Sequence, residues 1–237
     1  MEIINVIPEN SKENTLFCIR DLNSPGFHAK SKWFEDRIKE GMRLKILQDE
    51  DRKIAYIEYI PSEYAWRPVK ARNYMFIQCM FTYAKKDRNK GYATMLIREC
   101  EDDARTSGMH GVAVMTSQGA WITNKSLFKK LGYTQVEKLG RFELMVKKFD
   151  EAAPDPGLFD WTSRQKEYTG WHLLYSDQCP WHVKAVEAIQ RVAAEHGIDL
   201  DIRKIPTALD AQSSPSGFGT FALLHNGKLL EDHYISE

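Results

Sequence analysis

The sequence has no charge excess of either sign and no long apolar run. Lysine plus arginine and aspartate plus glutamate are balanced at 33 each, which argues against a nucleic-acid binder because such proteins carry a basic excess. No apolar stretch reaches the length of about 18 residues that a membrane helix needs, so we predict no membrane span. The segment Met1-Glu2-Ile3-Ile4-Asn5 lacks the charged start and apolar core of a signal peptide, and we expect a cytoplasmic protein.

Cysteine is also scarce, and its spacing excludes two further classes. The four cysteines form no Cys-x-x-Cys pair, which disfavours a zinc site and a disulfide scaffold, so no metal is predicted. Apolar residues make up 43% of the 237 positions, which is enough for a packed core. Two prolines and a glycine between Glu151 and Gly157 read as a linker. We therefore predict domains over residues 1–150 and 167–237, with a linker over 151–166.

Hydrophobic periodicity and turn residues predict mixed strands and helices in both domains. In the first domain we expect strands over residues 1–7, 44–47, 54–60, 74–83, 111–115 and 141–146, and helices over 31–40, 91–107 and 125–131. Ser31 is expected to cap the first of these helices and Gly41 to end it. In the second domain we expect strands over 171–175, 198–205, 220–224 and 228–230, and a helix from about 183 to 196.

The most informative stretch is Arg88-Asn89-Lys90-Gly91-Tyr92-Ala93, between the strand over 74–83 and the helix that follows. The first N–H groups of a helix lack intrahelical partners and the helix dipole is positive there, so such a turn can hold a phosphate or pyrophosphate. Gly91 lets the backbone approach closely, and Ala93 is small for the same reason. Arg88 and Lys90 add positive charge.

Arg-x-x-Gly-x-Ala after an apolar strand resembles the coenzyme A loop of the GNAT acetyltransferase superfamily, whose pattern is Gln/Arg-x-x-Gly-x-Gly/Ala. The stretch from Asn124 to Tyr133, Asn-Lys-Ser-Leu-Phe-Lys-Lys-Leu-Gly-Tyr, resembles the later helix of that family, where Asn is followed by Leu-Tyr-x-Lys-x-Gly-Phe. The resemblance implies an α/β GNAT fold with a mixed central sheet. It also implies an N-acetyltransferase that moves an acetyl group from acetyl-CoA to a small-molecule or peptide amine by direct attack.

The resemblance further implies where acetyl-CoA would bind. The turn over 88–94 would cradle the pyrophosphate through backbone amides, and the strand edge over 81–83 would pair with the pantetheine arm. Separation of this strand from its neighbour would open a gap for the thioester, with a backbone N–H to stabilise the oxyanion. The predicted cofactor-binding residues are Phe81, Thr82, Tyr83, Arg88, Asn89, Lys90, Gly91, Tyr92, Ala93, Thr94, Asn124 and Phe128.

The sequence departs from the family pattern at the groups that move protons. The strand over 74–83 has no carboxylate, although many GNAT enzymes place a glutamate base there. The base is then Glu58, Glu63 or a water relay, and the alternative for each glutamate is a solvated surface carboxylate. Phe128 replaces the tyrosine that often acts as the acid. Either the thiolate leaves unassisted or Tyr83 or Tyr133 protonates it, and the alternative for both tyrosines is core packing.

The loop from Glu63 to Pro68 is a candidate wall for the acceptor. The aromatic rings of Tyr64 and Trp66 can stack on a flat or apolar acceptor, and Arg67 can clamp a carboxylate. The alternative is that these aromatic side chains fill the edge of the core.

The second half resembles a small thioredoxin-like domain. Cys179-Pro180-Trp181-His182 stands where glutaredoxins carry Cys-Pro-Tyr-Cys, and Gly219-Thr220 stands where thioredoxins carry cis-proline and threonine. The turn His225-Asn226-Gly227 predicts a hairpin after it. An acetyltransferase joined to such a domain resembles the YoaP-like acetyltransferases over nearly the whole chain. Thioredoxin-like domains carry a helix after this hairpin, and we predict none in the residues from the hairpin to Glu237.

Cys179 precedes a helix, whose dipole would stabilise a thiolate, and His182 one turn away could lower the thiol pKa further. However, the resolving cysteine and the cis-proline are replaced. The domain then either carries thiol chemistry or has kept the fold and serves as a lid, a dimer contact or an acceptor wall. The alternative functions are a thiol-redox enzyme and a non-catalytic acyl-CoA-binding regulator. The uncovered hairpin edge near Leu229 points to a homodimer contact.

Overall fold

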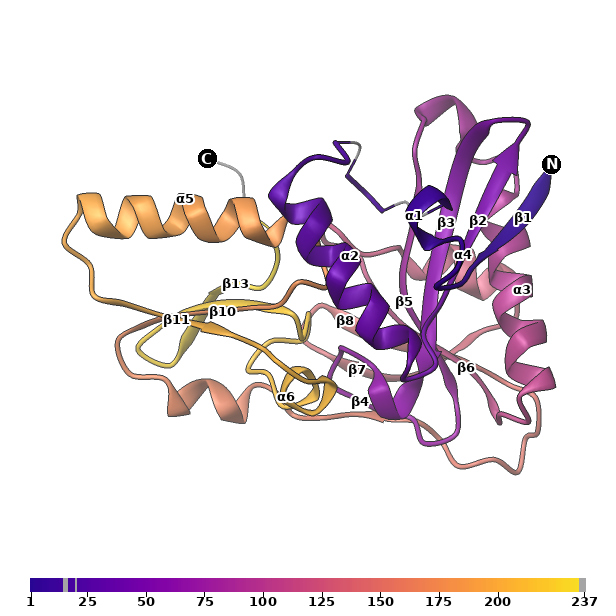
Figure 1. Cartoon of the computed structure of the whole chain (residues 1–237). Coiled ribbons are helices and arrows are strands. Elements are labelled where there is room, and N and C mark those ends of the chain that lie inside the picture. The colour runs from indigo at the N-terminus through magenta and orange to yellow at the C-terminus, as the bar shows by residue number, and fades with distance from the viewer. Residues whose placement is uncertain (15–16, 20, 235–237) are drawn as a thin grey trace. The chain divides into compact units, whose positions relative to one another are not determined.

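Seven strands of the N-terminal part pair into one mixed sheet in a computed structural model, which describes residues 1–14, 17–19 and 21–234 (Figure 1). Only β5 and β6 are parallel, and every other neighbouring pair is antiparallel. The predicted mixed sheet is therefore confirmed. In sheet order the strands are β1 (Glu2–Val6), β2 (Arg43–Asp49), β3 (Arg52–Pro61), β5 (Met75–Thr82), β6 (Gly111–Ser117), β8 (Phe142–Lys148) and β7 (Thr134–Leu139).

The chain divides into two compact units, and each unit uses more than one stretch of sequence. The first unit consists of Met1–Arg20, Phe34–Tyr64 and Lys70–Gly157, and the second of Asp21–Trp33, Ala65–Val69 and Leu158–Glu237. Two segments from the N-terminal half thus belong with the C-terminal unit, which a search for linkers along the sequence could not detect. The short strands β4 (Val69–Lys70) and β9 (Gly157–Leu158) pair with each other.

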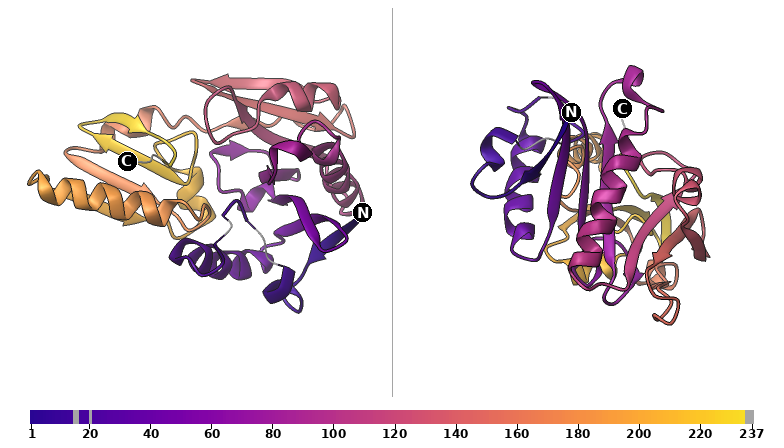
Figure 2. Two further views of the ribbon diagram at one scale, coloured as in Figure 1. Left: turned by 90° about the horizontal axis from the view of Figure 1, so that it is seen from above. Right: turned by 90° about the vertical axis from the view of Figure 1, so that its right-hand side faces the viewer.

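Helix α3 (Tyr92–Thr106) packs along one face of the large sheet (Figures 1 and 2). Its apolar stripe, Leu96, Ile97, Cys100 and Ala104, is buried against side chains of β3 and β5. This spacing places one side chain per turn on the same face, and the predicted helix over 91–107 is confirmed. The first unit also contains α1 (Ser11–Asn14), α4 (Lys125–Lys130) and the 3-10 turns η1 (Ser62–Tyr64) and η2 (Lys85–Asp87).

Helix α2 (Pro25–Ile38) begins six residues before the predicted start at Ser31, so that prediction is wrong. The hydroxyl of Ser24 accepts from the Phe27 amide at 3.2 Å, and Pro25 takes the first helical position, where its missing N–H costs nothing. The predicted end is correct, because Gly41 adopts a φ of +90°. Strand β7 was not predicted because it is an edge strand with mostly exposed side chains.

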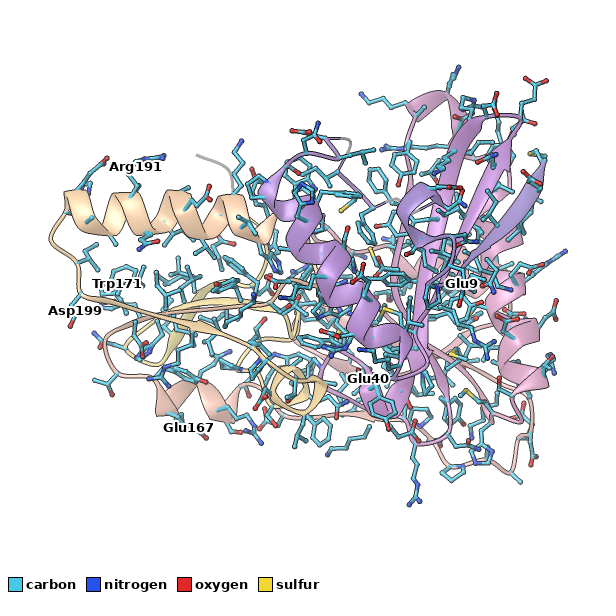
Figure 3. The ribbon with its side chains drawn as sticks, in the orientation of Figure 1. Glu9, Glu40, Glu167, Trp171, Arg191 and Asp199 are labelled. Carbon is cyan, nitrogen blue, oxygen red and sulfur yellow. The ribbon has the colours of Figure 1, made fainter. Side chains whose placement is uncertain are left out.

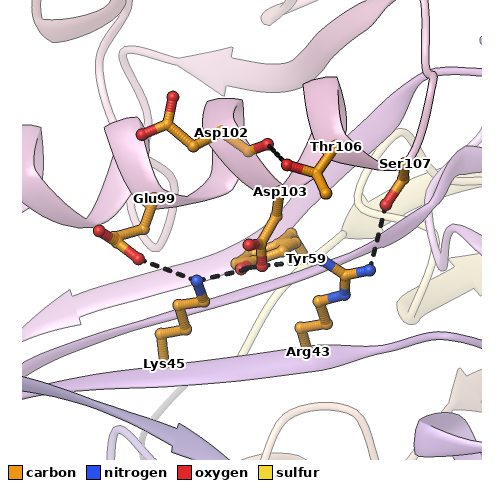
Figure 4. Close-up of polar contacts among 8 residues, drawn as sticks. All are labelled: Arg43, Lys45, Tyr59, Glu99, Asp102, Asp103, Thr106 and Ser107. Carbon is orange, nitrogen blue, oxygen red and sulfur yellow. Dashed lines mark hydrogen bonds and ion pairs between the residues drawn. The ribbon is translucent and has the colours of Figure 1, made fainter.

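A network of charges joins α3 to β2 and β3 (Figure 4). The Asp103 carboxylate accepts from the Tyr59 hydroxyl, from Arg43 at 2.8 Å and from Lys45 at 3.1 Å. Lys45 is itself buried and also pairs with Glu99 at 2.9 Å. Burial opposes ionisation of Asp103, but the hydrogen bonds from Tyr59, Arg43 and Lys45 outweigh it and lower its pKa.

We expect Asp103→Asn to lower the free energy of unfolding by about 2 kcal/mol at pH 7, because buried Lys45 loses one of its two carboxylates. A carboxylate with a lowered pKa stabilises the fold above its unfolded pKa, and this contribution is lost as the pH falls through the folded pKa. The difference from wild type in urea titrations should therefore shrink from pH 5 to pH 2. Exposed Asp102→Asn is the matched control, and an equal effect of both changes would contradict the network's role.

The second unit contains a four-stranded sheet with the order β11-β10-β12-β13. Strands β10 and β11 are parallel, whereas β12 pairs antiparallel with both β10 and β13. Its elements are η3 (Ser163–Glu167), β10 (Trp171–Tyr175), α5 (His182–Glu195), β11 (Leu200–Lys204), α6 (Ala208–Gln212), β12 (Phe221–His225) and β13 (Lys228–Glu231). The predicted hairpin turn at Asn226 and Gly227 is confirmed, since both have positive φ.

Side chains of β10, α5 and β12 form a small core of their own. Leu173, Ala185, Phe221 and Leu223 are its buried members. Trp171, labelled in Figure 3, stacks on His225 of the neighbouring strand with ring centroids 4.2 Å apart. Across the part of the chain that the structure describes, no helix is long and apolar enough to cross a membrane.

Candidate active site

The turn before α3 leaves the first amides of that helix uncapped. Gly91 is the N-cap residue with a φ of +83°, and as a glycine it supplies no side-chain cap. Asn89 also has a positive φ, +62°, so the chain reverses sharply at two positions. A Cβ on Gly91 would meet no atom within 4 Å, so the space beside this residue is open. The helix start thus has the form that a phosphate site requires.

A buried carboxylate inside η2 holds this turn, and sequence reasoning missed it. Asp87 has almost no exposed side chain, and it pairs with Arg52 and, at 3.7 Å, with Lys90. The hydrogen bond from Arg52 lowers the pKa of Asp87, so the carboxylate is ionised at neutral pH. Arg88 remains exposed beside it. Because Asp87 and Arg52 come from distant parts of the chain, no local pattern could have indicated their pairing.

Strand β5 separates from β6 just before this turn, as the resemblance implied. The two strands pair only from Met75 to Ile77. Gln78 forms a bulge, because Glu58 pairs with Cys79 whereas the next residue, Tyr59, pairs with Ile77. From Gln78 to Thr82 the β6-facing edge of β5 has no strand partner among the described residues. An open edge from Gln78 to Tyr83 spans about 17 Å at the usual rise of a strand.

Glu58 lies on β3 directly opposite Cys79, one residue from the bulge. Its side chain is fully buried, so the alternative of a solvated surface carboxylate is wrong for this residue. The Tyr56 hydroxyl lies 3.2 Å from the Cys79 sulfur, and burial raises the pKa of Tyr56 well above its usual value. Cys79 itself is partly exposed. Glu58 therefore borders the open part of β5.

The other candidate groups for proton transfer have structural partners. Glu63 is exposed, and its carboxylate accepts from the Asn73 amide at 2.7 Å. The Tyr83 hydroxyl donates to the Phe17 carbonyl at 2.6 Å. Tyr133 is buried against Phe128 with ring centroids 5.2 Å apart, and burial raises the pKa of its hydroxyl. For Tyr133 the core-packing alternative therefore holds.

Two predicted cofactor residues lie on α4 or at its start. The Asn124 side-chain oxygen caps this helix by accepting from the Ser126 amide at 2.9 Å, which leaves its NH₂ group for other contacts. Phe128 is fully buried in the core beside Tyr133. Its ring packs in this core and has no exposed surface for a ligand.

Of the three predicted acceptor residues, only Tyr64 is exposed, with 45% of its surface accessible. Trp66 is fully buried in the second unit, where its ring meets Trp33 edge-on at 5.1 Å. Arg67 is buried as well, and its guanidinium lies 3.9 Å from the ring centre of Phe218. The placement of Trp66 and Arg67 agrees with the alternative that this loop fills a core.

His182 does not act as a cation beside Cys179, and that expectation is wrong. Its ring is buried, with Nδ1 2.8 Å from the Ser176 carbonyl and the ring centre 5.1 Å from that of Phe221. Burial lowers the pKa of His182 to about 4, so the ring is neutral at pH 7. Sequence spacing placed His182 one turn from Cys179 but could not show that its ring points into the core.

The buried ring of His182 should make the second unit sensitive to acid. The unfolded chain takes up a proton near pH 6.5, whereas the folded ring does so only near pH 4. Stability should therefore fall by about 3 kcal/mol as the pH drops across this interval. In thermal unfolding scans, His182→Gln should remove this slope and exposed His196→Gln should keep it. An unchanged slope in His182→Gln would assign the acid sensitivity to other groups.

Comparison with known proteins finds one relative along nearly the full chain. The uncharacterized N-acetyltransferase YoaP of Bacillus subtilis (strain 168) is 25% identical over 239 residues, covering 98% of this chain and 94% of the relative. No family model matches the chain. The predicted N-acetyltransferase activity agrees with the name of this relative, and the predicted similarity to YoaP is confirmed.

Solved structures of acetyltransferases also resemble part of the chain. The ribosomal-protein-alanine N-acetyltransferase of Brucella melitensis is 19% identical with a TM-score of 0.45, over 63% of this chain and all of that one. The putative acetyltransferase yncA of Salmonella typhimurium, solved with acetyl-CoA, is 20% identical with a TM-score of 0.42, over 62% of this chain and 87% of that one.

Proposed function

We propose that the protein is an N-acetyltransferase that moves an acetyl group from acetyl-CoA to the amine of a small molecule or peptide. The observation that carries this proposal is the continuity of an open strand edge, a sharp turn and an uncapped helix start. Strand β5 leaves β6 after Ile77, and the chain then passes through the turn at Gly91 into α3. Similarity to YoaP over 98% of the chain supports the same activity.

Acetyl-CoA fits this arrangement along its length. The pyrophosphate would lie at the first amides of α3, with Arg88 and Lys90 beside it and residues 89 and 91–94 supplying backbone N–H groups. The pantetheine arm would follow the open edge of β5 at Phe81, Thr82 and Tyr83 toward the bulge at Gln78. The side-chain NH₂ of Asn124 is the contact proposed from α4. A backbone N–H beside the bulge would stabilise the oxyanion of the tetrahedral intermediate.

Glu58 is the residue that we propose as general base. An amine must lose its proton to attack the thioester, and the base must stand close to the acetyl group. Glu58 meets this need because it lies opposite Cys79, where β5 and β6 have parted. The proton would pass from the amine to the Glu58 carboxylate, directly or through one water. The thiolate of coenzyme A would then leave as the carbonyl re-forms.

The acceptor would approach from the side on which Tyr64 is exposed. The aromatic ring of Tyr64 offers an apolar contact near the end of β3, whereas buried Trp66 and Arg67 would act by shaping the loop. Glu63 would contribute through its bond to the Asn73 amide, which fixes the same loop. These contacts suit an amine with an apolar or aromatic portion.

We further propose that the second unit is a thioredoxin-like domain. Its sheet order, with β10 and β11 parallel and β12 and β13 antiparallel, supports this assignment, as does the turn with Cys179 between β10 and α5. The backbone at Gly219, which stands where thioredoxins carry cis-proline, has a φ of +77° and no cis bond.

Release of free thiol from acetyl-CoA in the presence of an amine panel tests the activity. We expect amine-dependent thiol release that Ellman's reagent detects. A folded protein that binds acetyl-CoA and acetylates no amine in the panel would favour the regulator alternative.

We also expect Cys179→Ser to keep the full rate of acetyl transfer, and a loss of more than tenfold would favour the thiol-redox alternative.

A further inference from the structure

The second unit holds the segment Ala65–Val69 by side-chain bonds from two sides. The buried amide of Gln212, at the end of α6, donates from Nε2 to the Ala65 carbonyl at 3.1 Å. In the other direction, Arg67 donates to the Phe218 carbonyl and lies over the Phe218 ring at 3.9 Å. The segment is thus tied to the stretch between α6 and β12 at two successive points.

Backbone packing at Gly219 brings the two stretches closer than any side chain would allow. A Cβ on Gly219 would lie 2.7 Å from the Trp66 carbonyl oxygen and 2.9 Å from the Arg67 Cα. The φ of +77° at Gly219 also favours glycine. Both features require glycine here, and together they bring the 65–69 backbone into direct contact with residue 219.

The start of α2, which belongs to the same unit, covers the turn that carries Cys179. A Cβ on Gly26 would overlap the carbonyl oxygen of Pro180, so the helix backbone rests on this turn. Trp33, two turns further along α2, meets Trp66 edge-on. The first part of α2 and the 65–69 segment are therefore in contact within the second unit.

We propose that the second unit is an internal clamp: the surface formed by Gln212, Phe218 and Gly219 binds the chain's own Ala65–Val69 segment, and Cys179 carries out no thiol exchange. The segment that fits this surface bends at residues 66–68, and Arg67 supplies the guanidinium that lies over the Phe218 ring. Helix α2 leads into β2, and the 65–69 segment follows β3. The clamp therefore holds the segment that follows the strand carrying Glu58, whose role as a base rests on the proposed function.

Hydrogen–deuterium exchange of the full chain tests the clamp without any acceptor. The reporter is the Val69 amide, which donates to the Arg67 carbonyl at 2.8 Å. Gln212→Ala should speed its exchange about fivefold, because one buried hydrogen bond is lost. The matched control is Gln165→Ala, which removes a partly buried bond of the same length, Nε2 to the Pro215 carbonyl at 3.1 Å, and should leave the Val69 amide unchanged.

Gly219→Val should speed exchange at Val69 by more than tenfold, because the segment must move away. Unchanged exchange in Gln212→Ala would overturn the clamp even if Gly219→Val does not fold.

Glutathione-dependent reduction of 2-hydroxyethyl disulfide provides the second test. We expect equal rates for wild type and Cys179→Ser. A lower rate for Cys179→Ser would show that Cys179 does exchange thiols and would contradict this part of the proposal. Neither test uses acetyl-CoA. The exchange rates and the disulfide reduction rates can therefore be interpreted even if the protein has no acetyltransferase activity.

Discussion

Glu58→Gln is expected to lower kcat for acetyl transfer by about 10²- to 10⁴-fold, the usual contribution of a positioned general base. Glutamine keeps the size of the buried side chain but cannot accept the proton of the amine. Acetyl-CoA binding should change by less than about threefold, because the role proposed for Glu58 is toward the amine and the residue lies on β3, not at the turn before α3. The measurement is steady-state thiol release with the best amine of the panel, alongside calorimetric acetyl-CoA binding.

Glu63→Gln is the matched control, because it removes the other carboxylate that the sequence offered. It should keep most of the activity, since Glu63 is exposed and bonded to the Asn73 amide. Activity of Glu58→Gln should partly recover above the pKa of the acceptor amine, where the amine is neutral without help. If Glu58→Gln retains full activity and Glu63→Gln does not, the base is Glu63.

Gly26→Ala is expected to lower the free energy of unfolding by about 3 kcal/mol, in the range of an overpacked interior. Glycine is normally the weaker helix former, so the same change in an open helix would stabilise the protein by about 1 kcal/mol. A decrease in the free energy of unfolding therefore indicates close packing at Gly26, and an increase indicates open space there. Urea unfolding followed by circular dichroism gives the measurement.

The destabilisation follows from the close approach of Gly26 in α2 to the carbonyl of Pro180. Gly108→Ala tests a glycine with open space around it, and its cost comes only from a φ of +67°. We expect Gly26→Ala to be the more harmful of the two. A stabilised Gly26→Ala variant would mean that α2 does not rest on the turn with Cys179.

Local signals in the sequence were sufficient for most elements of the fold. The helix start at Gly91 and the hairpin at Asn226 each depend on a few neighbouring residues, and each was predicted correctly. The separation of β5 from β6 was implied by the resemblance and is present after Ile77. The start of α2 was not predicted because Ser31 also fits a capping position, whereas Ser24 and Pro25 are the residues that begin the helix.

Features that depend on distant parts of the chain could not be predicted from local patterns. Burial of Glu58 depends on β3 lying inside the sheet, with β2 and β5 on either side. Burial of Trp66 and Arg67 depends on contacts with Trp33 and Phe218. From the sequence alone, a charged or aromatic residue in a loop is predicted to be exposed, because the residues that cover it come from distant parts of the chain.

Calorimetric binding of acetyl-CoA tests the central claim most directly. Wild type should bind in the micromolar range, and Gly91→Trp should abolish binding because the indole fills the space where the pyrophosphate would lie. Gly108→Trp is the matched control at the other end of α3, since Gly108 also has a positive φ and open space around it. It should bind like wild type. Absence of binding by folded wild type, or equal binding by Gly91→Trp, would contradict the cofactor site and the proposed acetyltransferase activity.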